Sequence, residues 1–261
     1  MGTTDIFFGG SLSLKKCSWY VIYWDWTKGR PTQRKITDNN PPLKLTTQGD
    51  KDTTLIKRND PKTASRILGV HLSPMGDFST QLQILRTKAN NFAIRLRSPK
   101  LTATNIVTFH RTTYAPSMRY VLPVMAIDEE ELATLQTQVL QLMMNKLGYS
   151  RTTPIKIRHG PSAMGGLDLY DLRTKVGICQ LKYFRDSVYS NNEAGKLMLI
   201  NVQFMQLESG LSQPLLEHPQ IRISYLTPTW TTSLQQFLYQ HNLQVTLTDQ
   251  YMSKQPSRSP R

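Results

Sequence analysis

Seven basic side chains and no carboxylate occur between Phe78 and Ile127, a stretch that is the strongest chemical signal in the chain. Apolar residues recur among them at helical spacing, so we expect the charges to lie on a folded surface rather than in a basic tail. A surface of this kind attracts polyanions. The stretch predicts contacts to a nucleic-acid backbone. The competing interpretation is a helix face that is simply solvated. The seven basic residues are Arg86, Lys88, Arg95, Arg97, Lys100, Arg111 and Arg119.

Two groups of carboxylates are the candidates for catalysis. Chemistry on nucleic acids usually needs carboxylates that hold two metal ions a few ångströms apart, and the chain has no adjacent Asp-Asp pair. The run Asp128-Glu129-Glu130-Glu131 stands where helical spacing begins, and acidic side chains stabilise that end of a helix without a metal. Asp171, which follows Asp168 in GGLDLYDL, is predicted to cap a helix. We therefore expect no catalytic residue and no metal site.

The five histidines and two cysteines show no metal-ligand spacing either. No two histidines are four residues apart, the spacing that places two imidazoles on one helix face. Cys17 and Cys179 are too far apart for a zinc knuckle and too few for a secreted disulfide framework. The chain also lacks a signal-like N-terminus and a run of roughly twenty apolar residues. We expect an intracellular protein that does not cross a membrane.

The predicted secondary structure changes from strands to helices near residue 76, and these elements must position the basic residues. The segments 18–26, SWYVIYWDW, and 65–72, SRILGVHL, each predict one strand, the second with a bulge or close approach at Gly69. The segment 160–166 is glycine-rich and predicts a turn. Helices are expected from Phe78, from Thr102 or Thr104 to a kink or end at Pro116, from Asp128 to Gly148, and over 171–188, 193–207 and 229–241.

This order predicts an α+β fold, with a short β region at the N-terminus followed by mainly helical regions. The chain has 261 residues, 39% of them hydrophobic, which is enough to bury a core. Its formal net charge is +14. We divide it into regions 1–75, 76–148 and 149–248 and a disordered basic tail over 249–261. The apolar positions expected to face inward are Leu82, Leu85, Ala89, Phe92 and Leu96, then Leu132, Leu135, Val139, Leu142 and Met143.

Three segments occur in a set order: GGSLSLKKCSWYVIYWDW at 9–26, SRILGVHLSPMGD at 65–77 and GPSAMGGLDLYDL at 160–172. In that order the chain resembles the C-terminal part of reverse transcriptases encoded by non-LTR retrotransposons. In that family a Lys-Cys or Lys-Thr pair ends the palm, and Lys16 and Cys17 match it. A leucine-glycine-valine strand then holds the primer end, and Leu68, Gly69 and Val70 match that.

The resemblance implies a palm remnant over 1–75, a helical thumb over 76–148 that grips the primer–template duplex, and a helical C-terminal region. It also implies that the catalytic aspartates of the family lie upstream of the matched segments. We expect a chain that does not polymerise alone and that meets Mg²⁺ only where the missing palm is present. The partners implied are RNA, DNA or an RNA/DNA hybrid, and the missing palm and fingers.

Three hypotheses stay open on the sequence alone. The first is a reverse-transcriptase-derived fragment that binds nucleic acid without sequence preference, with Tyr114 and Tyr120 either stacking on bases or lying in the core. The second is a polymerase that becomes active when another polypeptide supplies the palm. The third is an unrelated basic helical protein that binds acidic partners and has no role with nucleic acids.

Overall fold

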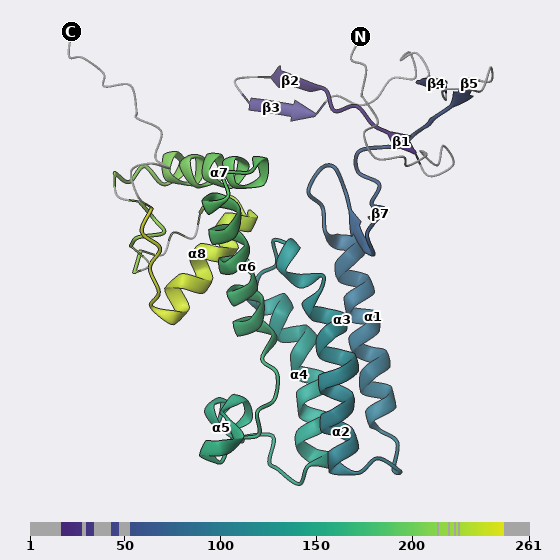
Figure 1. The fold of residues 1–261 in the computed structure, drawn as a ribbon, viewed down its shortest axis with the longest axis vertical. Coiled ribbons are helices and arrows are strands. Elements are labelled where there is room, and N and C mark those ends of the chain that lie inside the picture. Colours follow the sequence, from purple (N-terminus) through teal and green to yellow (C-terminus); the bar gives the residue numbers. More distant parts are fainter. Residues whose placement is uncertain are drawn as a thin grey trace. The chain divides into compact units, whose positions relative to one another are not determined.

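The computed structural model describes residues 17–27, 30–33, 43–46, 53–212, 214–218, 220–221, 223 and 225–247. The chain divides into two compact units, Met1–Gln81 and Leu82–Arg261. The first holds short strands and the second holds helices, so the α+β prediction is confirmed (Figure 1). Lys16 and the tail 249–261 lie outside the described residues.

The described part of the first unit contains four two-stranded sheets. One pair is parallel, and the other three are antiparallel hairpins. The parallel pair is β1 (Ser18–Trp19) with β6 (Lys57–Arg58). The hairpins are β2 (Trp24–Thr27) with β3 (Arg30–Gln33), β4 (Lys44–Thr46) with β5 (Thr53–Leu55), and β7 (Ser65–Ile67) with β8 (Val70–Leu72).

Trp19 ties the parallel pair together from its edge. Its indole Nε1 donates a hydrogen bond to the carbonyl oxygen of Ile56 at 3.1 Å. The guanidinium of Arg58 lies 5.3 Å from the Trp19 ring centroid, close enough for a cation–π contact. These contacts support a pair of strands that is only two residues long on each side.

The single strand predicted over 18–26 is wrong in extent. The chain forms β1 and β2 instead, and the two strands have different partners: β1 pairs with β6, whereas β2 pairs with β3. Trp24 and Trp26 on β2 are 55% and 75% exposed.

The predicted strand over 65–72 is a hairpin. Leu68 and Gly69 both have positive φ, 49° and 87°, which is the backbone of a tight two-residue turn between β7 and β8. Gly69 therefore makes the turn rather than a bulge. Leu68 is 85% exposed at the tip, whereas Val70 is buried.

The helices begin at the end of the first unit and fill the second (Figure 1). Between the helices, the described residues also form one π-helical turn and two 3₁₀ turns. In chain order the elements are α1 (Ser79–Leu96), α2 (Ala103–Phe109), the π turn (His110–Tyr114), α3 (Ala115–Arg119), a 3₁₀ turn (Leu122–Val124), α4 (Glu129–Lys146), α5 (Ile155–His159), a 3₁₀ turn (Ser162–Met164), α6 (Leu172–Tyr189), α7 (Glu193–Ser209) and α8 (Trp230–His241).

Side-chain caps explain where several helices start. Asp128 Oδ1 accepts a hydrogen bond from the backbone N–H of Glu131 at 2.7 Å. Asp128 is therefore the N-cap of α4, which begins at Glu129. Asp171 accepts from the N–H of Thr174 at 3.2 Å and begins α6 in the same way. Both aspartates are thus caps. For Asp171 this is the predicted role, whereas the acidic run 128–131 was expected only to mark and stabilise the start of a helix.

Pro116 does not end its helix. The π turn ahead of it lets the N–H of Ala115 donate to the carbonyl of His110, five residues earlier, and α3 continues to Arg119. The backbone is helical on both sides of the π turn, so Pro116 lacks one N–H of a continuous helix, and the wider π turn is where the hydrogen-bond ladder adjusts to it. The expected break at Pro116 is therefore replaced by a widened turn.

Two hydrophobic layers hold the helical unit. In the first, all five positions predicted on α1 are buried, as are Leu132, Leu135, Val139 and Met143 on α4. Leu142 is only half-buried. Leu140 and Met144 are buried instead, because α4 packs against both α2 and α6 and its apolar stripe lies between them. Near these helices, an ion pair between Glu129 and Arg173 joins the starts of α4 and α6.

The second layer lies where α6, α7 and α8 meet (Figure 1). Its buried residues include Phe184, Val202, Met205, Leu234 and Phe237. Among the described helices, none has the length and apolarity needed to cross a membrane.

Candidate nucleic-acid interface

The predicted basic residues of α1 are exposed, but they do not form one surface. Residues seven apart on a helix point in nearly the same direction, whereas residues two apart point in roughly opposite directions. Lys88 and Arg95 therefore lie on one side of the buried stripe of α1. Arg86 and Arg97 lie on the other side, and Lys100 follows the end of the helix.

Arg86 is already engaged by a carboxylate. Its guanidinium lies 3.8 Å from Glu131 Oε1 in the first turn of α4. Partial burial and the nearby charge of Asp128 raise the pKa of Glu131, and Arg86 opposes this rise. The charge of Arg86 is thus partly compensated, and it is a poorer candidate for a phosphate contact than the sequence suggests.

Lys88 and Arg95 line a groove of about 270 Å³ between α1 and the π turn, called here the α1 groove. Neither forms an ion pair in the part of the chain that the structure describes. Phe92 and Phe109 stack along this groove with ring centroids 4.5 Å apart. The other lining residues are Asn91, Thr113, Tyr114 and Ser117.

The two tyrosines of this region have different environments. Tyr114 is 2% exposed, and its hydroxyl donates to the carbonyl oxygen of Leu135 at 2.9 Å. Burial raises the pKa of Tyr114. Tyr114 is therefore a core residue, whereas Tyr120 is 60% exposed.

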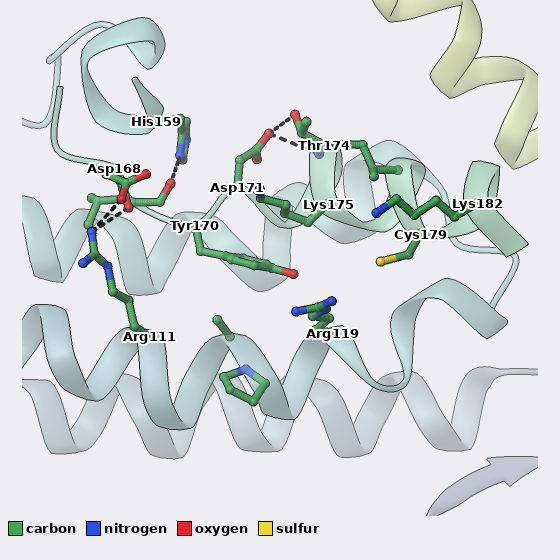
Figure 2. A pocket seen from close by; sticks show the side chains of 14 residues that line it. Arg111, Arg119, His159, Asp168, Tyr170, Asp171, Thr174, Lys175, Cys179 and Lys182 are labelled. Atoms are coloured by element: carbon green, nitrogen blue, oxygen red, sulfur yellow. Dashed lines mark hydrogen bonds and ion pairs between the residues drawn. The ribbon is translucent and has the colours of Figure 1, made fainter. Parts of the chain in front are cut away.

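A larger cavity, of about 600 Å³, lies between α3 and α6 and is called here the α3–α6 cavity (Figure 2). Arg111 and Arg119 line it, so the structure brings these two predicted residues together. Its other lining residues are Ala115, Pro116, His159, Asp168, Leu169, Tyr170, Asp171, Thr174, Lys175, Ile178, Cys179 and Lys182.

The segment 168–171 is held over this cavity by polar contacts. Arg111 Nη2 donates to Asp168 Oδ2 at 2.9 Å. His159 Nδ1 donates to the carbonyl oxygen of Leu169 at 2.9 Å, and Leu169 is buried. Asp171 also accepts from the Thr174 hydroxyl. Figure 2 shows these contacts along the upper and left edges of the cavity.

The glycine-rich segment places 168–171 by folding back on α5. The N–H groups of Leu167 and Leu169 donate to the carbonyls of Ile157 and Arg158, at 2.9 and 3.0 Å. Gly160 and Gly166 approach so closely that a Cβ on Gly166 would lie 2.1 Å from the Gly160 carbonyl oxygen. The predicted turn is correct, and Gly160 and Gly166 allow this close approach of the backbone.

The positive charge of the α3–α6 cavity is only partly compensated. Arg119, Lys175 and Lys182 are exposed and form no ion pair with any described residue. Lys175 and Lys182 were missed by the sequence analysis. They are seven residues apart on α6 and so share a face, a spacing that was visible in the sequence.

Tyr170 adds a hydroxyl to the same space. Figure 2 shows its ring across the middle of the cavity, with the hydroxyl toward the Arg119 guanidinium. Partial burial raises the pKa of Tyr170, the charge of Arg119 lowers it, and Cys179 and Asp171 raise it further. The net rise keeps the phenol protonated and able to donate at neutral pH.

Among the described residues, no three His, Cys, Asp or Glu side chains are placed to hold a metal ion. The two carboxylates of the cavity already have partners, Arg111 and Thr174. These carboxylates do not fit a magnesium site.

The residues matched to the palm lie in the first unit. Cys17 is half-buried. Leu68 and Gly69 form the turn of the β7–β8 hairpin and Val70 begins β8, so the three residues are not one strand.

The chain matches no protein-family model, no curated protein and no solved structure with which it was compared. The α1 groove and the α3–α6 cavity are the structural features that bear on function.

Proposed function

We propose that the helical unit binds the phosphate backbone of RNA, DNA or an RNA/DNA hybrid, as the thumb-like part of a chain related to reverse transcriptases. One observation carries the proposal: five exposed cations from three helices line two concave sites without an ion-pair partner among the described residues. They are Lys88, Arg95, Arg119, Lys175 and Lys182.

Such a surface binds by charge and does not read bases. Lysine and arginine contacts to phosphates set position and affinity and carry no sequence information. Each neutralised phosphate releases counterions, so affinity falls as salt rises, with a logarithmic slope of roughly −0.9 per contact for duplex DNA. Five cations predict a steep salt dependence and little sequence preference.

The resemblance to reverse transcriptases gives this binding its context, since a thumb grips a primer–template duplex. The proposed role includes no catalytic residue in this chain. Polymerisation would require a palm and fingers supplied by another polypeptide, together with their Mg²⁺. The proposed setting is intracellular, where such nucleic acids occur.

Fluorescence anisotropy of the whole chain with a labelled RNA/DNA hybrid tests the proposal across about 50 to 200 mM salt. Lys88→Ala/Arg95→Ala and Arg119→Ala/Lys182→Ala each remove two candidate phosphate contacts. The control Arg86→Ala/Arg185→Ala removes two charges that already have carboxylate partners, Glu131 and Asp186.

The expected result is a salt slope that falls by about two in each test variant and by less in the control. Absence of binding, or equal losses in all three variants, would overturn the proposal. Tight binding to an acidic protein that the hybrid does not displace would instead favour a protein-binding role.

A further inference from the structure

The α3–α6 cavity has a charge that suits a doubly charged anion. Four cationic side chains and two carboxylates line it, which gives a formal net charge of +2 when His159 is left out of the count. The Asp168 carboxylate is paired with Arg111, and the Asp171 carboxylate caps α6. The excess therefore resides on Arg119, Lys175 and Lys182.

The donors of these residues come from two opposite sides of the cavity. Arg119 ends α3, whereas Lys175 and Lys182 lie on α6. Figure 2 shows the Arg119 guanidinium below the Tyr170 hydroxyl, with the Lys182 ammonium and the Cys179 thiol on the α6 side. An anion held between the two helices would meet charged donors from both.

A phosphate monoester fits this arrangement better than the internal diester of a strand. A monoester has three terminal oxygens and a charge of about −1.5 to −2 at neutral pH. A diester has two such oxygens and a single negative charge. Guanidinium, ammonium and phenol donors, in a cavity of net charge +2, match the larger number of oxygens and the larger charge.

The cavity also has room for what the phosphate is attached to. Its volume of about 600 Å³ is within the usual range of small-molecule sites. Ala115, Pro116 and Ile178 supply an apolar part of the lining. A sugar and base can rest there while the phosphate occupies the charged part.

We propose that the α3–α6 cavity is a phosphate-monoester site that takes either a free mononucleotide or the phosphorylated end of a nucleic-acid strand. The strand-end form rests on the proposed function, since it requires the helical unit to hold a nucleic acid. The mononucleotide form does not. The α1 groove contacts internal phosphates alone, whereas the α3–α6 cavity contacts an internal phosphate where no terminal phosphate is present.

The test uses the whole chain and two versions of one labelled hybrid, with a 5′-phosphate or a 5′-hydroxyl on the strand end. Adenosine monophosphate and adenosine are added separately as free ligands, and their binding is followed by calorimetry. Arg119→Gln/Lys182→Gln removes charge from the cavity, Tyr170→Phe removes one donor, and Lys88→Ala/Arg95→Ala is the matched control. Circular dichroism verifies that each variant is folded.

We expect the 5′-phosphate to tighten hybrid binding about tenfold, or the monophosphate to bind while adenosine does not. Arg119→Gln/Lys182→Gln should abolish either preference and Tyr170→Phe should reduce it a few-fold. Lys88→Ala/Arg95→Ala should weaken both hybrids equally and leave the preference intact.

A preference for the phosphorylated end without binding of the monophosphate would identify the strand end as the source. Monophosphate binding without hybrid binding would support the site while removing the proposed nucleic-acid function. Equal affinity for the two hybrids together with no monophosphate binding would overturn the inference. So would a preference that survives in folded Arg119→Gln/Lys182→Gln.

Discussion

The guanidinium of Arg111 donates to the carboxylate of Asp168 at 2.9 Å and to the Asp168 carbonyl oxygen at 3.3 Å. This pair joins the π turn to the segment that covers the α3–α6 cavity. The two side chains are 50% and 58% exposed, so solvent screens the pair and its stabilising contribution is small. Its larger effect is electrostatic, because Asp168 neutralises one of the four cations of the cavity.

Asp168→Asn should therefore strengthen anion binding. Asp168 has φ 47°, and asparagine tolerates this left-handed backbone well. We expect a several-fold gain in affinity for the hybrid at low salt and a change in unfolding free energy below about 0.5 kcal/mol. Asp186→Asn, which frees Arg185 outside the cavity, is the charge-matched control. A loss of affinity would show that the ion pair mainly holds the covering segment in place.

His110 predicts how stability depends on pH. The ring is fully buried, and neither nitrogen has a hydrogen-bond partner among the described residues. Burial, helped by the charges of Arg111 and His159, lowers the pKa of His110 from 6.5 to about 4. Between pH 6.5 and about 4, His110 is protonated in the unfolded chain but not in the folded chain. The free energy of unfolding therefore falls as the pH falls through this range, and above pH 6.5 His110 does not change it.

His110→Leu should remove that component. Each pH unit between the two pKa values is worth roughly 1.4 kcal/mol, so about 3 kcal/mol of pH-dependent stability should disappear. Urea unfolding of parent and variant at several values between pH 4 and 7.5 measures it. An equal slope in both proteins would mean that another group titrates in this window.

Most helix boundaries could be predicted because the signals that set them are local. Asp128, Asp171 and Thr229 each precede an apolar helical pattern, and each caps the helix that follows. Strand extent is different, since it depends on partners elsewhere in the chain. The aromatic run at 18–26 satisfies strand preferences throughout, yet it forms two strands, because β1 pairs with β6 and β2 pairs with β3.

The candidate site was predicted in part for a similar reason. Arg111 and Arg119 stood out within one carboxylate-free stretch. Lys175 and Lys182 are distant in sequence and lie near two carboxylates, so only the packing of α3 against α6 reveals that all four cations share a cavity. By contrast, helical periodicity alone places Lys88 and Arg95 on one side of the buried stripe of α1 and Arg86 and Arg97 on the other, so this separation could be predicted from the sequence.

Alanine substitutions at Gly165 and Gly166 should lower the free energy of unfolding by different amounts. A Cβ on Gly166 would meet the backbone of Gly160, which cannot move aside, so Gly166→Ala should destabilise by about 2 kcal/mol or more and weaken anion binding. Gly165 has φ +78° but open space around it, so Gly165→Ala should cost only about 1 kcal/mol. Urea unfolding compares the two. Equal losses would contradict the steric account of Gly166.

Gly177 lets α6 and α8 approach. Alanine there would favour the helix by roughly 1 kcal/mol, but its Cβ would lie 2.0 Å from the buried ring of Phe237. We expect Gly177→Ala to destabilise by about 1 to 3 kcal/mol overall. Phe237→Leu empties part of that space, so the double variant should be at least about 1 kcal/mol more stable than additivity predicts.

Gly195 supplies the control for the double-mutant cycle of Gly177→Ala and Phe237→Leu. A Cβ there would lie 2.2 Å from the backbone carbonyl oxygen of Ser187, and shortening a side chain cannot relieve a clash with backbone. Gly195→Ala/Phe237→Leu should therefore be additive within about 0.5 kcal/mol. Only a direct contact makes the cost of an added Cβ depend on the size of the Phe237 side chain. Non-additivity of Gly195→Ala with Phe237→Leu, or additivity of Gly177→Ala with Phe237→Leu, would therefore show that Phe237 does not limit the approach of α6 and α8.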